Sequence, residues 1–145
     1  MTPQIFRVPD EGGTVLLSLL LLLPAVLLVV LVFVFWPRAL QIEVTSGELK
    51  VTGSIYGRTL SRADLELDAA RAVDLGHERA LIPVRRSNGI GLANYKVGWF
   101  RLKNGQRALC FLTRVDSVIY LPTKKDFVLL LSTSEPDRLL AALGK

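Results

Sequence analysis

The chain has 145 residues, of which 50% are hydrophobic, and it carries a formal net charge of +5 at pH 7. This length leaves room for one domain of ordinary size. Cys110 is the only cysteine, so an intramolecular disulfide is excluded.

Residues 14–36 form an apolar stretch without a single charged side chain. As a helix, these 23 residues would span about 34 Å, which matches a hydrocarbon core of about 30 Å. Membrane helices tolerate a proline such as Pro24 as a kink, and Trp36, followed by Arg38, stands where an interfacial aromatic belongs. We therefore predict an N-terminal tail at 1–13 and a transmembrane helix at 14–36.

Two other interpretations of this stretch fit less well. A cleaved signal peptide needs a positively charged start, a shorter apolar region and a small-x-small cleavage site. Residues 1–13 contain one arginine against two acidic residues, and no such cleavage site follows the apolar run. A buried core helix is disfavoured because so uniform a run has no polar face.

Basic residues favour a cytoplasmic position for the remainder of the chain. Arg7 precedes the apolar stretch, whereas Arg38 and Lys50 follow it. Residues 37–145 hold 17 of the 18 basic and 11 of the 13 acidic residues, a net charge of +6, which suits the anionic inner leaflet. We expect a single-pass protein of the cell membrane with a cytoplasmic C-terminal domain over 37–145.

Short strands dominate the first part of residues 37–145. The alternation of apolar and polar side chains predicts a first hairpin over 39–53, which turns at Ser46-Gly47. A third strand is expected over 54–60. No long linker separates this region from the apolar stretch.

Residues 61–75 are ambiguous. Asp64, Glu66 and Asp68 alternate with leucines, which is the period of a strand, whereas the later part could be a helical turn or another strand. Three carboxylates on one strand face could ligate a hard cation. The segment lacks EF-hand spacing and basic residues surround it, so an exposed polar face is favoured and no metal is expected.

Residues 80–97 predict a strand that runs into a glycine-containing loop at Ser87–Gly91. Gly89-x-Gly91 could suggest a dinucleotide fingerprint, which needs a third glycine and a following helix. Asn94 stands in place of that glycine and no helical pattern follows. The segment is therefore interpreted as a loop between strands, and no cofactor is expected.

Residues 98–112 predict a second hairpin. Asn104-Gly105 supplies the two positive-φ residues of a two-residue type I′ turn. Cys110 falls within an apolar strand and is expected to be a small core residue. His77 is the only histidine and no catalytic motif surrounds Cys110, so enzymatic activity is not expected.

The chain ends with further strands at 116–122 and 126–133 and a helix over 134–145. Ser134 and Asp137 form the pattern of a capping box. The other helix signals are Pro136 in the first turn, an apolar stripe of Leu139, Leu140 and Leu143, and Gly144 as the stop. About seven short antiparallel strands before one helix would close or bend into a small barrel or two packed sheets, with the helix covering one open side.

Glycine, aromatic and capping residues recur along 88–113 and 118–143. These segments resemble the bacterial pleckstrin-homology-like (PH-like) domain family, in which a glycine-rich loop and a G-[WYF]-F-x-x-x-x-G hairpin precede a strand that ends in threonine and an S-x-x-[DE] helix start. The matching positions are Gly98, Trp99, Phe100, Gly105, Thr123, Ser132, Ser134 and Asp137. The resemblance covers roughly 40–143. It implies a PH-like barrel and a membrane location, and it supplies no catalytic residue.

Basic residues gather around the glycine segment and the second hairpin. Together with Asn88 and Gly89 they form a candidate binding surface, whose members are Arg85, Arg86, Asn88, Gly89, Lys96, Arg101, Lys103, Lys124 and Lys125; Arg107 is also on the hairpin. If several face the membrane, each could contribute about 1 kcal/mol to binding an anionic lipid surface. An ordinary solvated basic surface is the competing interpretation. The first hairpin loop, residues 45–48, has no basic residue, so the familiar phosphoinositide site is not expected.

These observations predict a noncatalytic single-pass membrane protein whose PH-like domain binds a partner protein or itself. The alternative is that its basic face binds an anionic lipid surface or a small anionic ligand. Nucleic-acid binding is disfavoured by the membrane tether and the few exposed aromatic residues.

Overall fold

The computed structural model describes residues 12–35 and 40–144. Contacts divide the chain into two units, Met1–Trp36 and Pro37–Lys145. Most of the predicted tail, residues 1–11, lies outside the described residues, as do Trp36 and Arg38.

The described part of the first unit is α1, Gly12–Phe35, a helix of 24 residues. It begins slightly ahead of the predicted start, and Pro24 lies inside it without ending it. The side chains of residues 20–32 are exposed. Among the described residues, no helix meets the length and hydropathy that a membrane crossing requires.

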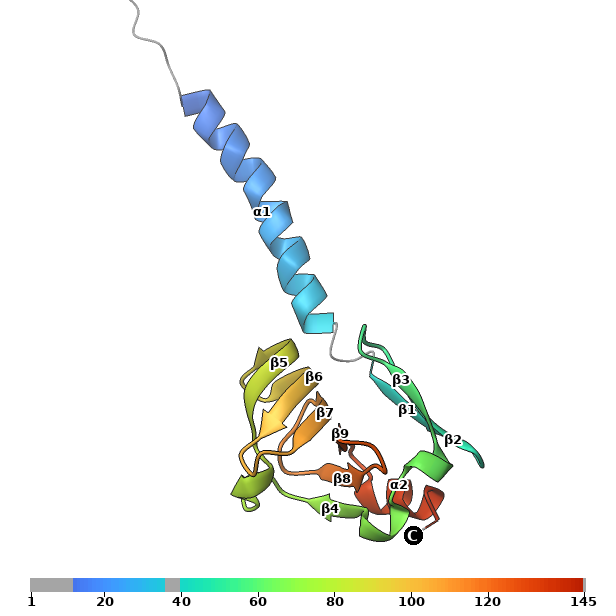
Figure 1. Cartoon of the computed structure of the whole chain (residues 1–145). Helices are drawn as coiled ribbons and strands as arrows, with labels where there is room; N and C mark the ends of the chain where they lie inside the picture. Colours follow the sequence, from blue (N-terminus) through green and yellow to red (C-terminus); the bar gives the residue numbers. More distant parts are fainter. Residues whose placement is uncertain (1–11, 36–39, 145) are drawn as a thin grey trace, which may run out of the picture. The chain divides into compact units, whose positions relative to one another are not determined.

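The second unit contains a three-stranded antiparallel sheet and a six-stranded sheet (Figure 1). The small sheet has the order β1-β2-β3, with β1 at Gln41–Val44, β2 at Glu48–Thr52 and β3 at Arg58–Ser61. The large sheet has the order β4-β8-β9-β7-β6-β5. Its strands are β4, Arg71–Val73; β5, Pro83–Leu92; β6, Tyr95–Leu102; β7, Arg107–Leu112; β8, Val118–Pro122; and β9, Val128–Ser132.

The mainly-β fold with a C-terminal helix is confirmed, but the prediction of about seven antiparallel strands in a barrel is wrong. The described residues form nine strands in two sheets that do not close, and β7 and β9 are parallel. The reason is topological. Because β9 pairs with both β7 and β8, it inserts between two strands that are consecutive in the chain and runs in the same direction as β7.

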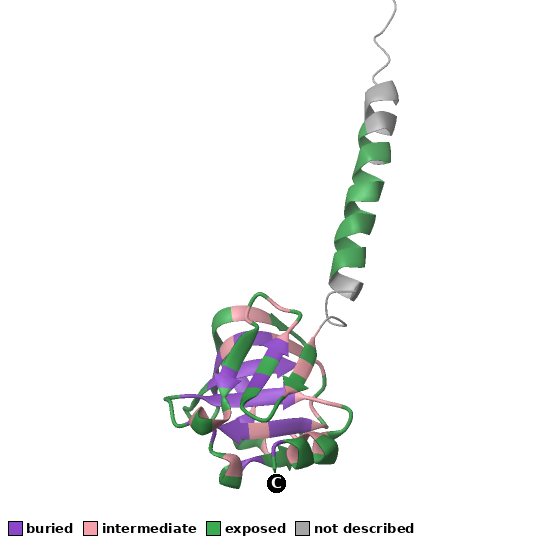
Figure 2. Cartoon of the chain, turned by 90° about the vertical axis from the view of Figure 1, so that its right-hand side faces the viewer, coloured by how far each residue is buried: buried purple, intermediate pink, exposed green. Residues whose placement is uncertain are grey.

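The two sheets pack around a first core cluster. Leu49 and Leu60 of the small sheet meet Leu109 and Leu129 of the large sheet, and Leu143, which directly follows α2, completes the cluster. Burial of one such side chain stabilises the fold by about 1.5–3 kcal/mol. Figure 2 shows the buried residues concentrated in the strands of the large sheet.

The opposite face of the large sheet carries a second core cluster, which includes Cys110 and Leu130. Residues 74–82 connect β4 to β5, the two edge strands of this sheet, and Leu75 and Leu81 of the connection are buried in the cluster. Both faces of the large sheet are therefore covered, which explains why β7, β8 and β9 are almost entirely apolar.

Two turn predictions are wrong. The expected loop at Ser87–Gly91 lies inside β5, and β5 and β6 instead turn at Ala93-Asn94. Asn104 has no positive φ, because Ala93 is the only described non-glycine residue that has one. The second hairpin therefore has a three-residue loop instead of a type I′ turn.

The geometry of that loop is defined by two backbone hydrogen bonds. The N–H of Gly105 donates to the carbonyl of Leu102 at 2.9 Å, and the N–H of Leu102 donates to the carbonyl of Gln106 at 2.8 Å. Gly105 has a φ of +89°, the left-handed residue typical of three-residue hairpin loops.

The ambiguous segment contains no strand through its carboxylates. Short 3-10 helices occupy Arg62–Asp64 and Leu67–Ala69, so Asp64, Glu66 and Asp68 do not share a strand face. The alternation was misleading because Leu65 is buried in the core from a position between the two 3-10 helices, where its backbone forms only an isolated bridge with Thr123.

The C-terminal helix α2 is Pro136–Ala142. Pro136 stands at its start as predicted, and Gly144, with a φ of +83°, follows its end. The capping box is wrong: Glu135 is the N-cap residue and no side chain caps the helix. The N–H of Glu135 itself donates a hydrogen bond to the hydroxyl of Thr133 at 3.2 Å.

Candidate functional site

The predicted surface residues are spread over two strands and two loops of the domain. Their positions are β5 for Arg85, Arg86, Asn88 and Gly89, β6 for Lys96 and Arg101, the β6–β7 loop for Lys103, and the β8–β9 loop for Lys124 and Lys125. Arg85 and Arg101 are cross-strand partners. Lys96 lies toward the other end of β6, where its ammonium donates to the carbonyl of Ala93.

Three arginines stand side by side on neighbouring strands. Arg101 of β6 pairs with Arg85 of β5 on one side and with Arg107 of β7 on the other. Adjacent strands lie about 4.8 Å apart, and paired residues direct their side chains to the same face. We call Arg85, Arg101 and Arg107 the arginine ladder.

The ladder lies on the sheet face that carries the first core cluster. Arg101 is two residues from Trp99, which packs against that cluster, so the two side chains share a face. Arg86 pairs instead with Phe100, which is buried in the second cluster on the opposite face. Neighbouring arginines of β5 therefore point to different faces.

All three ladder side chains are exposed. The ion pairs found among the described residues include none of them. Arg101 donates a hydrogen bond to the carbonyl of Gly105 at 2.9 Å. Like charges directly opposite each other destabilise a sheet, so this row is expected to cost some stability.

The ring of Trp99 contacts one arginine of the ladder and two residues from other parts of the domain. The guanidinium of Arg107 lies 4.2 Å from the centre of the Trp99 ring. A second guanidinium, that of Arg58 on β3, lies 5.4 Å from the same ring. Phe127 contacts Trp99 edge to face, with ring centres 5.1 Å apart. Cation–π contacts of this kind orient a guanidinium without neutralising its charge.

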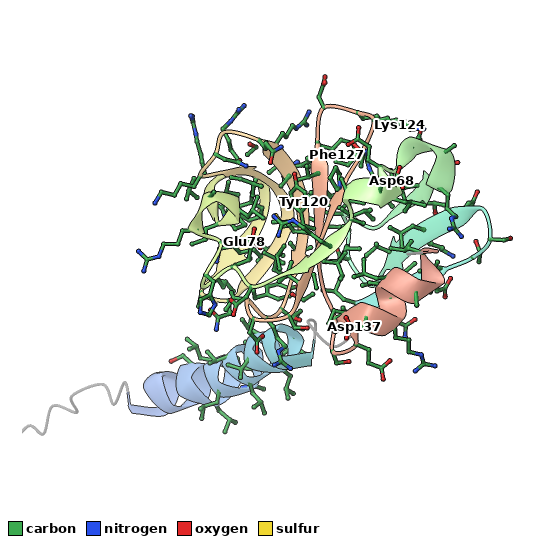
Figure 3. The ribbon with its side chains drawn as sticks, turned by 90° about the horizontal axis from the view of Figure 1, so that it is seen from below. Asp68, Glu78, Tyr120, Lys124, Phe127 and Asp137 are labelled. Atoms are coloured by element: carbon green, nitrogen blue, oxygen red, sulfur yellow. The ribbon has the colours of Figure 1, made fainter. Side chains whose placement is uncertain are left out.

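A surface groove of about 710 Å³ adjoins the ladder. Its basic lining residues are Arg101, Arg107 and Lys125, and its acidic ones are Glu66 and Asp126. Tyr120 and Phe127 also line it, and Figure 3 shows both on the side of the domain away from Asp137 of α2.

The β8–β9 loop beside the groove is held by Thr123. Its buried hydroxyl donates to the carbonyl of Phe127 at 2.6 Å and accepts the N–H of Lys125 at 3.2 Å. The ammonium of Lys125 lies 2.8 Å from a carboxylate oxygen of Asp64, so its charge already has a partner. Lys124, labelled in Figure 3, is exposed in the same loop.

Two of the predicted binding residues have structural roles. The side-chain oxygen of Asn88 accepts the hydroxyl of Tyr56 at 3.0 Å, which links β5 to the chain just before β3. Gly89 and Gly98 are cross-strand partners, and a Cβ on Gly98 would come within 2.6 Å of the Cα of Gly89. Glycine here allows β5 and β6 to approach closely.

The two nucleophile or base candidates lie in different environments. Cys110 is fully buried, as predicted, and burial raises the pKa of its thiol to about 12. His77 is exposed and its Nδ1 lies 2.9 Å from a carboxylate oxygen of Asp74. Hydrogen bonds from His77 and from the N–H of Gly76 lower the pKa of Asp74 below its ordinary value.

Sequence reasoning missed Arg58 and Trp99 and left Arg107 outside the predicted set. The signal for Arg107 was present, because a correct register of the second hairpin places it opposite Arg101. No sequence pattern could have placed Arg58 there, since β3 belongs to the other sheet.

Two sheets followed by a C-terminal helix fit the PH-like fold. The family model described as bacterial PH domain matches residues 40–145, so the chain belongs to that family and the predicted resemblance is confirmed. No curated protein and no solved structure matches the chain.

Proposed function

We propose that this protein is a noncatalytic, single-pass membrane protein whose PH-like domain binds a partner protein or a second copy of the chain. Membership of the family supports the domain's role, because PH-like domains are typically noncatalytic interaction modules. The observation that carries the proposal is the open edge of β5.

β5 is a ten-residue strand at the edge of the large sheet, where it pairs with β6 alone. An extended segment of a partner can add to such an edge through its backbone hydrogen bonds. Val84 and Leu92, near the two ends of β5, are 60% and 51% exposed and offer apolar contacts to that segment. Register shifts around Arg85 bend the strand, so a partner has to follow that bend.

The membrane anchor is supported by the sequence of α1 and its flanks. Residues 14–36 contain no charge, and the 24 residues of α1 correspond to about 36 Å of helix. The charge of the PH-like domain favours the cytoplasmic side. Extraction of membranes at alkaline pH tests the anchor: the full chain should stay in the pellet. Its appearance in the supernatant would contradict a membrane span, and a reporter fused after Lys145 reads the orientation.

Crosslinking in native membranes tests the interaction at β5. Ser87→Cys places a thiol on the exposed part of the strand, and a bismaleimide should then produce a discrete covalent dimer or heteroadduct. The native thiol of Cys110 stays silent because it is buried and protonated. Ser134→Cys, exposed just before α2, is the matched control. Adducts of equal yield from both variants, or from neither, would contradict the proposal.

The second candidate function is binding of an anionic surface or ligand, and the arginine ladder favours it. Flotation of the 37–145 fragment with vesicles at low salt tests this function, because anionic vesicles should recover more protein than neutral ones. Equal recovery would contradict it.

A further inference from the structure

We infer that the arginine ladder is a binding site for a phosphate group carried by a small molecule or a lipid headgroup. The inference deepens the second candidate function above, and it rests on the juxtaposition of Arg85, Arg101 and Arg107 on three adjacent strands beside a groove of about 710 Å³.

The charge of the ladder sets the class of ligand. The backbones of the three arginines lie on adjacent strands, about 4.8 Å apart per strand, and none of the three forms an ion pair within the described residues. A single carboxylate would neutralise only one of them. A phosphate monoester carries about −1.5 to −2 at neutral pH and presents several acceptor oxygens, so it can engage two guanidiniums at once.

The geometry of the ladder also suits a planar, two-pronged contact. The guanidinium of Arg107 is held 4.2 Å from the centre of the Trp99 ring, and the hydrogen bond to the Gly105 carbonyl holds one nitrogen of Arg101. A guanidinium that is already held loses less conformational freedom when it binds phosphate. A fourth guanidinium, that of Arg58 on the facing sheet, also contacts Trp99 and adds positive charge.

The acidic residues of the groove restrict where the ligand lies. Asp126 and Glu66 line the groove on the side of the β8–β9 loop and the 3-10 segments, whereas Arg101 and Arg107 line it from β6 and β7. An anion is therefore expected over the ladder and away from Asp126. Replacing Asp126 with asparagine should tighten binding, which a purely structural role for the ladder would not predict.

The test uses the full chain in a neutral detergent with Trp36→Phe, so that Trp99 is the only tryptophan. The probe is inorganic pyrophosphate at low ionic strength. A phosphate bound to Arg107 changes the charge next to the Trp99 ring and should change the emission of Trp99. Binding to the folded state should also raise the melting temperature.

Arg101→Gln should weaken pyrophosphate binding about ten- to hundredfold, the range expected for charged hydrogen bonds. Arg86→Gln, which removes the same charge from the opposite face of β5, should change the affinity by less than about twofold. Arg101→Lys keeps the positive charge but loses the planar guanidinium with its several donors. Its affinity for pyrophosphate should lie between those of Arg101→Gln and Arg86→Gln. A single cooperative thermal transition without ligand shows that each variant folds. If Arg101→Gln does not fold, Arg85→Gln takes its place.

A second experiment distinguishes a lipid headgroup from a free phosphate compound. It places the full chain in nanodiscs of phosphatidylcholine alone or of phosphatidylcholine with phosphatidic acid. A ladder-dependent response to phosphatidic acid identifies a lipid headgroup, and a response to pyrophosphate identifies a free phosphate compound. Equal losses of affinity in Arg86→Gln and Arg101→Gln would overturn the site and leave only a diffuse basic surface. No response of either readout to any probe would overturn both.

Discussion

Two neighbouring rows of residues on the same face of the large sheet differ in what holds them there. In one row Trp99 pairs with Leu109, and both side chains pack in the first core cluster. In the next row Arg101 pairs with Arg107, both side chains are exposed, and neither forms an ion pair within the described residues. Burial explains the first row. Folding gives the second row only a cation–π contact between Arg107 and Trp99 and a hydrogen bond from Arg101 to the carbonyl of Gly105, so its charges stay available to a ligand.

A paired arginine of the same sheet makes the contrast sharper. Arg71 on β4 contacts both carboxylate oxygens of Glu78, at 2.5 and 2.6 Å. Arg71 therefore has an acidic partner, whereas the three arginines of the ladder form no ion pair within the described residues. This difference can be tested by comparing what each arginine contributes to the stability of the domain.

The largest expected effect comes from the apolar row. Leu109→Ala should destabilise the domain by about 2–5 kcal/mol, because the side chain is fully buried and the core cannot fully close around the cavity. Leu92→Ala, at a 51% exposed position of β5, is the matched control and should cost about 0.5 kcal/mol or less. Denaturant unfolding of both variants in neutral detergent, with Trp36→Phe present so that the emission comes from Trp99, measures the two losses. Similar losses of unfolding free energy in Leu109→Ala and Leu92→Ala would show that the row of Leu109 does not belong to the core.

A second test addresses how β5 reaches the position that completes the ladder. Gly98 has a φ of +116°, and a Cβ there would lie 2.5 Å from the carbonyl oxygen of Asn88, which is backbone and cannot rotate away. Gly98→Ala should therefore destabilise the domain by about 2–4 kcal/mol through strain and overlap together. Gly105→Ala shares the positive φ but meets open space, so it should cost only about 1 kcal/mol. Equal losses from the two variants would mean that the close approach of β5 is unimportant.

The sequence predicted the elements better than it predicted their pairing. The first hairpin, the buried strand β9, the position of Pro136 and the burial of Cys110 all follow from alternation and local signals. The ladder did not follow, because a two-residue turn at Asn104-Gly105 would have placed Arg101 opposite Ala108. The three-residue loop shifts the register by one residue, which exchanges the faces and puts Arg107 opposite Arg101.

The remaining differences come from contacts that are distant in sequence. The glycines of β5 suggested a loop, yet Gly89 belongs to the strand because it faces Gly98 on β6. The parallel pairing of β7 and β9 depends on the choice of neighbours in the sheet, which alternation does not encode. Arg58 joins Trp99 only because two sheets meet there.

One substitution in the ladder should raise the stability of the domain, whereas most substitutions lower it. Arg85→Gln should stabilise the domain by about 0.2–1 kcal/mol at low salt, because it removes a like charge directly opposite Arg101. The gain should shrink at high salt as the repulsion is screened. Arg86→Gln, with buried Phe100 as its partner, should show neither the gain nor its salt dependence. A loss of stability in Arg85→Gln would mean that the ladder contributes to folding after all.

The smallest change in stability should come from breaking the pair of Arg71 and Glu78. This change should be a loss, whereas Arg85→Gln should give a gain. The hydrogen bond from Arg71 lowers the pKa of Glu78 below its ordinary value. A carboxyl whose pKa is lower in the folded than in the unfolded chain stabilises the fold above the unfolded pKa, and this contribution is lost as the pH falls through the folded pKa.

Glu78→Gln should therefore destabilise the domain at neutral pH, by less than about 0.5 kcal/mol because the pair is largely exposed and screened by solvent. The deficit relative to the unmodified chain should vanish in acid, as measured by unfolding at pH 7 and pH 3. Glu43→Gln, which removes the looser 3.8 Å contact with Lys50, is the control and should cost less. If Glu78→Gln instead stabilises the domain as Arg85→Gln does, the distinction between partnered and unpartnered arginines has no energetic basis, and the ladder needs no ligand to explain it.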